Sequence, residues 1–222
     1  MIVFVVASPK GGVGKSTLTT HLAVEAERAG DGPVVIVDAD QQGSLAHWFN
    51  QRKAGGGPHF LDVTKNGLKQ SLKDADRAGI AIAIIDTPGS LVEGLGSVIA
   101  LADFVIIPVV PSGFDLVPAA ESTSMVQEAG RPFVFVLNNA GTRAVLTGDA
   151  SRALSDYGPV SKVVIYNRQA YRSAVIDGRT APELAPNGLA AAEIAALWAD
   201  VLARTKRTQR QEGVRYGKAS NV

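Results

Sequence analysis

The chain alternates short apolar runs with longer amphipathic segments. Strand-length apolar runs occur at Ile2–Val6, Val34–Val37, Ile80–Ile85, Phe104–Val110, Phe133–Leu137 and Val160–Ile165, and a short strand is expected near Phe60–Val63. Segments with helical character occupy Lys15–Ala29, Ser44–Arg52, Gly67–Arg77, Pro118–Ala129, Ala150–Tyr157 and Leu189–Arg204. Apolar strands that alternate with helices are typical of a parallel sheet covered on both faces. We therefore predict an α/β fold with a mostly parallel, twisted sheet and helices on both faces.

The apolar periodicity stops at Arg204. We expect one domain over residues 1–204 and a loose C-terminal tail over residues 205–222. This tail is basic, because only Glu212 stands against the basic residues from Arg204 onward. At 222 residues and 46% hydrophobic content, the chain can bury one sizeable core without a second domain.

Composition narrows the possible functions only in part. With 22 basic and 21 acidic residues, the formal charge of +1 argues neither for nor against a polyanionic partner. The absence of cysteine excludes disulfides, thiolate metal sites and iron–sulfur ligation, and it fits a cytoplasmic protein. The apolar start has no basic region before it, so we interpret it as a core strand rather than a signal peptide. No apolar run is long enough to span a bilayer.

A glycine-rich loop follows the first predicted strand. Residues 7–17 read Ala-Ser-Pro-Lys-Gly-Gly-Val-Gly-Lys-Ser-Thr. Such a loop turns successive N–H groups toward one concavity that suits phosphate oxygens, and the next helix adds its positive dipole end. Lys15 supplies a positive charge and Ser16 a hydroxyl for Mg²⁺. The loop predicts a bound nucleoside triphosphate, with contacts from Lys10, Gly11, Gly12, Val13, Gly14, Lys15, Ser16 and Thr17.

Carboxylates follow two of the other predicted strands. Asp86 comes after four apolar residues, where it can hold a Mg²⁺-bound water; a helix cap or turn residue is the structural alternative. Asp38 and Asp40 straddle one residue at another strand end. One of these two can contact the water shell of the metal while the other addresses the attacking water, and the spacing alone does not assign the roles.

The phosphate loop departs from the plain Walker A pattern, because Pro9 replaces a glycine and Lys10 precedes the glycine pair. In this form it resembles the deviant Walker A motif of the ParA/MinD family of ATPases. The resemblance implies ATP and Mg²⁺ as ligands and a homodimer that forms on ATP. It implies that Lys10 reaches the phosphates of the partner's nucleotide. It also implies slow hydrolysis that an accessory protein, ParB-like or a cargo adaptor, accelerates.

The same resemblance assigns roles to the carboxylates. Residues 38–44 look like the first switch of ParA proteins, in which the second aspartate is needed for hydrolysis, although Gln41 stands where most relatives have proline. By this match the catalytic set is Lys10, Lys15 and Asp40, and the metal set is Ser16, Asp38 and Asp86. Residues 86–89 resemble the second switch. Asn138, at a strand end, matches the segment that recognises adenine, although asparagine there is also a common turn former.

The resemblance covers roughly residues 1–204. It includes residues 44–48, 108–112, 168–172, 178–180 and 191–198, all of which resemble small ParA proteins. Because the chain begins at its first strand, we expect it to lack the N-terminal DNA-binding extension of larger plasmid partition proteins. The expected protein is therefore an ATPase without that extension.

A dimer with a basic outer face would bind the DNA backbone without reading sequence. The candidate contacts are Lys162, Arg168, Arg172 and Arg179, with the basic residues of the tail as further candidates. A solvated polar surface is the structural alternative. Arg168 and Arg172, four residues apart, could equally form surface ion pairs.

Two other classes of protein remain as alternatives. A MinD-like membrane switch needs a C-terminal amphipathic helix, but the tail has only Val214, Tyr216 and Val222 as bulky apolar residues, so we expect no stable membrane association. A metabolic enzyme of the same fold needs a substrate pocket that the sequence does not identify. Metal-like spacing is absent among the histidines, and His21 is interpreted as a packing residue. We predict a cytoplasmic, nucleoid-associated ATPase that positions a plasmid, a chromosome region or a protein cargo.

Overall fold

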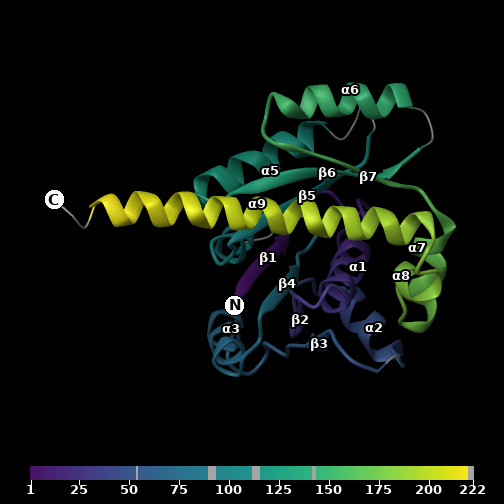
Figure 1. The fold of residues 1–222 in the computed structure, drawn as a ribbon, viewed down its shortest axis with the longest axis horizontal. Helices are drawn as coiled ribbons and strands as arrows, with labels where there is room; N and C mark the ends of the chain where they lie inside the picture. Colours follow the sequence, from purple (N-terminus) through teal and green to yellow (C-terminus); the bar gives the residue numbers. More distant parts are fainter. Residues whose placement is uncertain (54, 90–93, 112–115, 142–143, 220–222) are drawn as a thin grey trace.

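The computed structural model describes residues 1–222 except 54, 90–93, 112–115, 142–143 and 220–222 (Figure 1). Within these residues one sheet of seven strands has the order β3-β2-β4-β1-β5-β6-β7, and every neighbouring pair is parallel. The strands are β1 (Ile2–Val6), β2 (Val34–Asp38), β3 (His59–Phe60), β4 (Ile82–Asp86), β5 (Phe104–Val109), β6 (Phe133–Ala140) and β7 (Val160–Tyr166).

Helices cover both faces of this sheet. They are α1 (Lys15–Arg28), α2 (Ser44–Gln51), α3 (Leu68–Arg77), α4 (Leu95–Ile99), α5 (Leu116–Glu128), α6 (Ala144–Ser155), α7 (Gln169–Ala174), the 3₁₀ turn η1 (Val175–Asp177), α8 (Ala181–Leu184) and α9 (Leu189–Ala219). Side chains of β1 alternate between the two layers, as the pleat of a strand requires. Phe4 and Val6 pack with α1, α2, α7, α8 and α9, whereas Val3 and Val5 pack with α3, α4, α5 and α6. The predicted α/β fold is confirmed.

Strands β2, β4 and β1 are neighbours in the sheet and end in register. Asp86 of β4 lies opposite Val6 of β1 on one side and Asp38 of β2 on the other. The loops that follow these strands therefore meet at one edge of the sheet. In open α/β sheets this carboxyl edge is where ligands bind.

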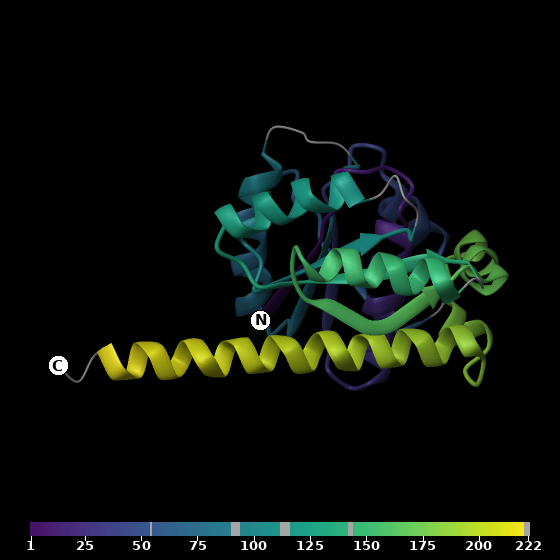
Figure 2. The same ribbon diagram turned by 90° about the horizontal axis from the view of Figure 1, so that it is seen from above.

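Helix α9 differs most from the sequence prediction. The predicted helix end at Arg204 is wrong, because α9 continues to Ala219 and its last turns project past the rest of the described chain (Figures 1 and 2). Residues 205–212 include neither glycine nor proline, and extending an existing helix needs no new nucleus, which accounts for the continuation up to Glu212; beyond it the helix also includes Gly213 and Gly217. The hydroxyl of buried Thr205 donates to the Val201 carbonyl at 2.9 Å. The expected boundary after residue 204 thus falls inside a continuous helix.

Candidate functional site

The glycine-rich loop connects β1 to α1 and opens onto a cleft of about 860 Å³. Residues 39–42, Ser44 and the Pro88–Gly89 turn complete the cleft wall. Gly14 has a left-handed φ of 89°, and a Cβ there would lie 2.4 Å from Nδ2 of Asn138. Only glycine fits this position. The structure thus brings residues 11, 12 and 14–17 of the predicted phosphate loop together around one cavity.

Lys15 is largely buried at the start of α1. Its Nζ donates to the Lys10 carbonyl oxygen at 3.2 Å, so the ammonium spans the loop. Burial lowers the pKa of Lys15, while the nearby carboxylates of Asp86 and Asp40 raise it. A phosphate group would add negative charge beside this ammonium and favour its charged form.

Asp86 is the most unusual ionisable group of the cleft. It is 0% exposed, and neither of its carboxylate oxygens meets a hydrogen-bond partner among the described residues. Burial raises the pKa of Asp86 to about 7; the Ser16 hydroxyl and Lys15 oppose this rise, while Asp38 and Asp40 reinforce it. A buried carboxylate without partners is costly unless a cation or donor joins it. Asp86 beside Ser16 therefore fits a hard cation such as Mg²⁺.

Asp38 and Asp40 occupy different environments. Asp38 accepts the N–H of Asp40 at 3.1 Å and the N–H of Ala46, in the first turn of α2, at 2.9 Å. Asp38 therefore holds the start of α2, a structural role that the sequence analysis did not anticipate. Asp40 lines the cleft, and its Oδ1 accepts the N–H of Gln42 at 3.0 Å. This arrangement suits the predicted assignment of Asp40 to the attacking water, which stays a prediction.

The turn after β4 lies directly against the phosphate loop. Thr87 is buried, and its hydroxyl donates to the Val6 carbonyl of β1 at 2.8 Å. A Cβ on Gly89 would come within 3.0 Å of the Gly11 Cα. Residues 86–89 are therefore placed to respond to whatever fills the loop.

A second pocket of about 270 Å³ adjoins the cleft and shares Gly12, Gly14 and Thr17 with it. Asn138 lines this pocket, as the adenine assignment requires, but its Nδ2 also donates to the Val13 carbonyl at 2.7 Å. Asn138 thereby fixes the loop, and its role toward a base stays a prediction. Tyr166 and Tyr171, which the sequence analysis did not single out, form part of the far wall.

His21 is a fully buried residue of α1, as the packing interpretation predicts. Its Nδ1 lies 2.7 Å from the Thr17 carbonyl, and its Nε2 accepts the N–H of Ala181 at 3.0 Å. Nδ1 therefore carries the proton. Burial lowers the pKa of His21 to about 4. His21 joins the helix that carries the phosphate loop to α8.

Helix α2 is also fastened to the α8 region. Arg52, just after α2, makes a bidentate pair with Glu183 at 2.8 and 3.0 Å and donates to the Gly178 carbonyl at 3.0 Å. The indole N–H of Trp48 donates to the Arg179 carbonyl at 3.1 Å. Through these contacts of α2, the loop that carries Asp38 and Asp40 is connected to the segment that carries Arg179.

The residues predicted to contact DNA do not form one free patch. Arg168 donates from Nε to Glu193 at 2.8 Å and from Nη2 at 2.6 Å, while its guanidinium lies 5.5 Å from the Tyr166 ring centroid. Lys162 is exposed on β7, and roughly 13 Å of extended strand separates it from Tyr166. The other two members have local partners: Arg172 donates to Asn167 at 2.8 Å and Arg179 pairs with Asp177. Their role in DNA binding stays a prediction, and the side chains of the tail residues Arg215 and Lys218 lie outside the described part.

The described part of the chain holds neither a metal cage of protein side chains nor a membrane-spanning helix. No three His, Cys, Asp or Glu side chains in this part gather as a metal cage. A Mg²⁺ ion would therefore rely on Ser16, one carboxylate, water and the ligand's own phosphates. In the same part of the chain, no helix has the length and apolar character needed to cross a membrane.

Comparison with known proteins agrees with this geometry. Residues 4–181 match the family model described as the CobQ/CobB/MinD/ParA nucleotide binding domain. The "Maintenance of carboxysome distribution protein A" of Halothiobacillus neapolitanus is 30% identical over 197 residues, covering 85% of this chain and 90% of that protein. The "Protein ParA" of Rhizobium radiobacter is 36% identical over 132 residues, covering 58% of this chain and 57% of that protein.

Solved structures support the fold. The cell division ATPase MinD of Pyrococcus furiosus superposes with a TM-score of 0.75 at 19% identity, covering 91% of this chain and 98% of that one. Apo McdA of Cyanothece gives a TM-score of 0.74 at 17% identity, covering 92% and 99%. The predicted resemblance and the predicted α/β nucleotide-binding fold are both confirmed.

Proposed function

We propose that this chain, which belongs to the CobQ/CobB/MinD/ParA family of nucleotide-binding domains, is an ATP-hydrolysing switch that positions a cargo. Relatives of known structure are named as ParA-family and MinD ATPases, which makes ATP the expected nucleotide. The printed name of one relative concerns carboxysome distribution. For this chain, we propose a plasmid, a chromosome region or a protein assembly as cargo.

The buried carboxylate of Asp86 is the observation that carries this proposal. Its two oxygens, which have no hydrogen-bond partner among the described residues, lie at the end of β4, and Ser16 and Lys15 of the phosphate loop are among the groups that act on its pKa. A purely structural aspartate in this position would be expected to have hydrogen-bond donors. If Asp86 serves to bind a cation next to nucleotide phosphates, it needs no such donors, which accounts for the absence of donors among the described residues.

The chain's own residues supply positioning and charge. The loop amides and the start of α1 bind phosphate oxygens, and Lys15 neutralises negative charge on them. Ser16 and Asp86 would hold Mg²⁺, which neutralises the charge that develops during phosphoryl transfer. Asp40, on the cleft wall, would orient and deprotonate the attacking water.

The active state in this proposal is a homodimer. Lys10 lies on the loop that borders the cleft, and we assign its side chain to the phosphates of the nucleotide in a partner subunit. Two chains would then face each other across their carboxyl edges, and hydrolysis would release them. An accessory protein, ParB-like or a cargo adaptor, would set the rate of this release.

Nonspecific DNA is the proposed surface on which the dimer acts, which would place it at the nucleoid. The exposed residues of α9 beyond Thr205 support DNA over a lipid bilayer. Those that are described are basic or amide-bearing: Lys206, Arg207, Gln209, Arg210 and Gln211. Basic side chains bind phosphates, whereas a membrane helix also needs bulky apolar side chains on one face.

One assay separates this function from its alternatives. The protein is incubated with random-sequence duplex DNA or with anionic liposomes, in the presence of ATP, ADP or no nucleotide, at two salt concentrations. ATP-dependent and salt-sensitive retention on DNA supports the proposal. Retention on liposomes instead supports a membrane switch, and binding to neither surface, with turnover of a small carboxylic acid, supports a metabolic enzyme.

A further inference from the structure

Another recess lies at the edge of the sheet opposite the phosphate loop. It has a volume of about 430 Å³ and sits where β5, β6 and β7 begin, under helix α9. In a parallel sheet the amino ends of the strands face away from the carboxyl edge. We call this recess the amino-edge groove; it is lined by Phe104, Arg131, Pro132, Phe133, Pro159, Arg204, Arg207 and Thr208.

The floor of the groove is apolar and rigid. Phe133 packs edge-on against Phe135, with ring centroids 5.4 Å apart and an interplanar angle of 83°. A Cβ on Gly158 would lie 2.4 Å from the Phe133 ring, so the glycine backbone lies directly against that ring. Pro132 and Pro159 complete this floor, and their side chains lose little conformational entropy when a ligand binds. A preformed apolar floor lowers the cost of receiving a ligand.

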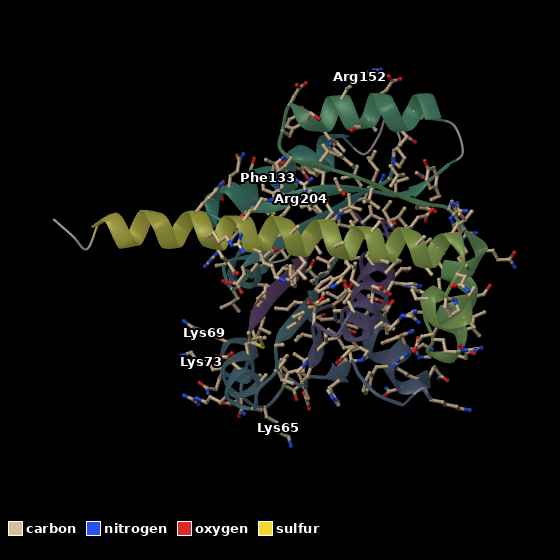
Figure 3. The ribbon with its side chains drawn as sticks, viewed as in Figure 1. Lys65, Lys69, Lys73, Phe133, Arg152 and Arg204 are labelled. Carbon is tan, nitrogen blue, oxygen red and sulfur yellow. The ribbon has the colours of Figure 1, made fainter. Side chains whose placement is uncertain are left out.

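The rim of the groove is cationic. Figure 3 labels Phe133 and Arg204 next to each other where α9 crosses the sheet. Arg204 is held by Asp200 through its Nε at 2.9 Å, whereas Arg207 is exposed and its Nε donates to the Ala203 carbonyl at 3.3 Å. Arg131 donates from Nη2 to a backbone carbonyl, while its Nε has no acceptor among the described residues. Among the described residues that line the groove there are three arginines and no carboxylate.

We propose that the amino-edge groove binds an acidic peptide segment of a protein partner. An apolar side chain of the peptide would rest on Phe133, and flanking carboxylates would pair with Arg207 and Arg131. A guanidinium group and a carboxylate can form a planar, bidentate pair of hydrogen bonds, so arginines favour a carboxylate ligand more specifically than charge attraction alone would. The groove volume lies in the range that accommodates a few side chains rather than a folded domain.

Duplex DNA fits the groove less well than a peptide. Its phosphates lie on a convex surface, and most protein contacts to DNA are made with those phosphates and sugars. Such a surface carries no apolar group that could enter a recess and cover Phe133 and the two prolines. A peptide supplies both the apolar anchor and the negative charge. The groove also lies away from the nucleotide cleft, so the inference does not depend on the proposed ATP switch.

The test uses the full chain without nucleotide and a phage-displayed library of random dodecapeptides as the probe. Enriched peptides are synthesised, and their affinity is measured by fluorescence anisotropy. Arg207→Glu reverses the rim charge at an exposed position, and Thr208→Trp fills the groove without changing charge. Arg152→Glu is the matched control, because it makes the same charge change on exposed α6, away from Arg204 (Figure 3). Circular dichroism confirms that each variant is folded.

We expect the enriched peptides to combine acidic residues with an aromatic or aliphatic one. Arg207→Glu and Thr208→Trp should each weaken their binding at least tenfold, while Arg152→Glu should change it less than twofold. No enrichment, enrichment of peptides without acidic residues, or binding that is indifferent to both groove variants would overturn the proposal. Loss of DNA retention in Arg207→Glu without any acidic peptide ligand would assign the groove to DNA instead.

Discussion

Gly89 and Gly11 lie so close that a single added carbon would bring the two loops into conflict. A Cβ on Gly89 would come 3.0 Å from the Gly11 Cα and 3.3 Å from both the Gly11 nitrogen and Lys15 Nζ. The turn after β4 therefore lies directly against the phosphate loop, close to the Gly11 backbone and to the Lys15 ammonium. Movement of one loop must therefore displace the other, because closely packed atoms cannot approach each other further.

The first prediction tests this contact. Gly89→Ala should displace the turn by a few tenths of an ångström and misplace Asp86 relative to the loop. We expect ATP hydrolysis to fall at least tenfold, while the midpoint of thermal unfolding falls by only a few degrees, since the change lies at a surface cleft. Hydrolysis is measured by phosphate release and unfolding by circular dichroism.

Gly96→Ala is the control for that substitution. Gly96 lies in α4, and a Cβ there meets no atom within 4 Å. The Gly96→Ala substitution should leave ATP hydrolysis unchanged and raise the free energy of unfolding by up to about 1 kcal/mol, because alanine has a higher helix propensity than glycine. If Gly89→Ala and Gly96→Ala hydrolyse ATP equally well, the contact with Gly11 has no part in the reaction.

Asp40→Ala tests the role assigned to the cleft-wall carboxylate. Removing the group that orients the attacking water should lower the hydrolysis rate by 10²–10⁴-fold, a range typical for the loss of a general base. ATP binding should persist, because Asp40 does not belong to the phosphate loop. Asp156→Ala, an exposed aspartate after α6, is the control. Undiminished turnover in the Asp40 variant would remove this residue from its proposed role.

Asp86→Asn tests the cation site by a readout that does not need turnover. Without nucleotide and metal, the variant should be more stable than the wild type by about 2 kcal/mol in urea unfolding, because an unpaired buried charge is removed. Added Mg²⁺ with ADP should then stabilise the wild type far more than the variant. Equal stabilisation of both proteins by Mg²⁺ and ADP would show that Asp86 does not serve the metal.

His21→Gln tests the pH dependence that buried His21 implies. Its folded pKa of about 4 lies below the ordinary 6.5, so the unfolded chain binds more protons between these values. Stability from this group is therefore fully present above pH 6.5 and is lost as the pH falls toward 4, by at most about 3 kcal/mol. Glutamine can accept the Ala181 N–H and donate to Thr17 without titrating.

The measurement for His21 is urea unfolding at pH 7 and pH 5. The His21→Gln variant should lose less stability over this interval than the wild type, and His47→Gln, at an exposed position of α2, should behave like the wild type. Parallel losses in all three proteins would mean that His21 does not stay neutral in the fold.

The sequence predicts the sheet well because each strand is a short apolar run bounded by turn residues. It predicts the phosphate loop and Asp86 for a different reason: their residue types are dictated by phosphate and cation chemistry. It misses α4 and α8, which have only five and four residues. Helices this short are stabilised by tertiary contacts rather than by their own periodicity.

Features that depend on distant partners could not be predicted from the sequence. The second function of Asp38, which holds the first turn of α2, follows from the fold of the loop between them. The sequence leaves Arg168 either as a DNA contact or as an ion-pair former, and it does not show that distant Glu193 and Tyr166 are the groups that contact its guanidinium. The extension of α9 was missed because its residues beyond Thr205 carry no apolar pattern, and Gly213 and Gly217 within it are poor helix formers.

The proposal depends most on ATP joining two copies of this chain at their phosphate loops. Its direct test is multi-angle light scattering of the Asp40→Ala protein with saturating ATP and Mg²⁺, compared with ADP and with Lys10→Ala in the same background. The account predicts twice the mass of one chain with ATP only, and a single-chain mass once Lys10 is removed. A single-chain mass under ATP and Mg²⁺ with Lys10 intact would contradict it.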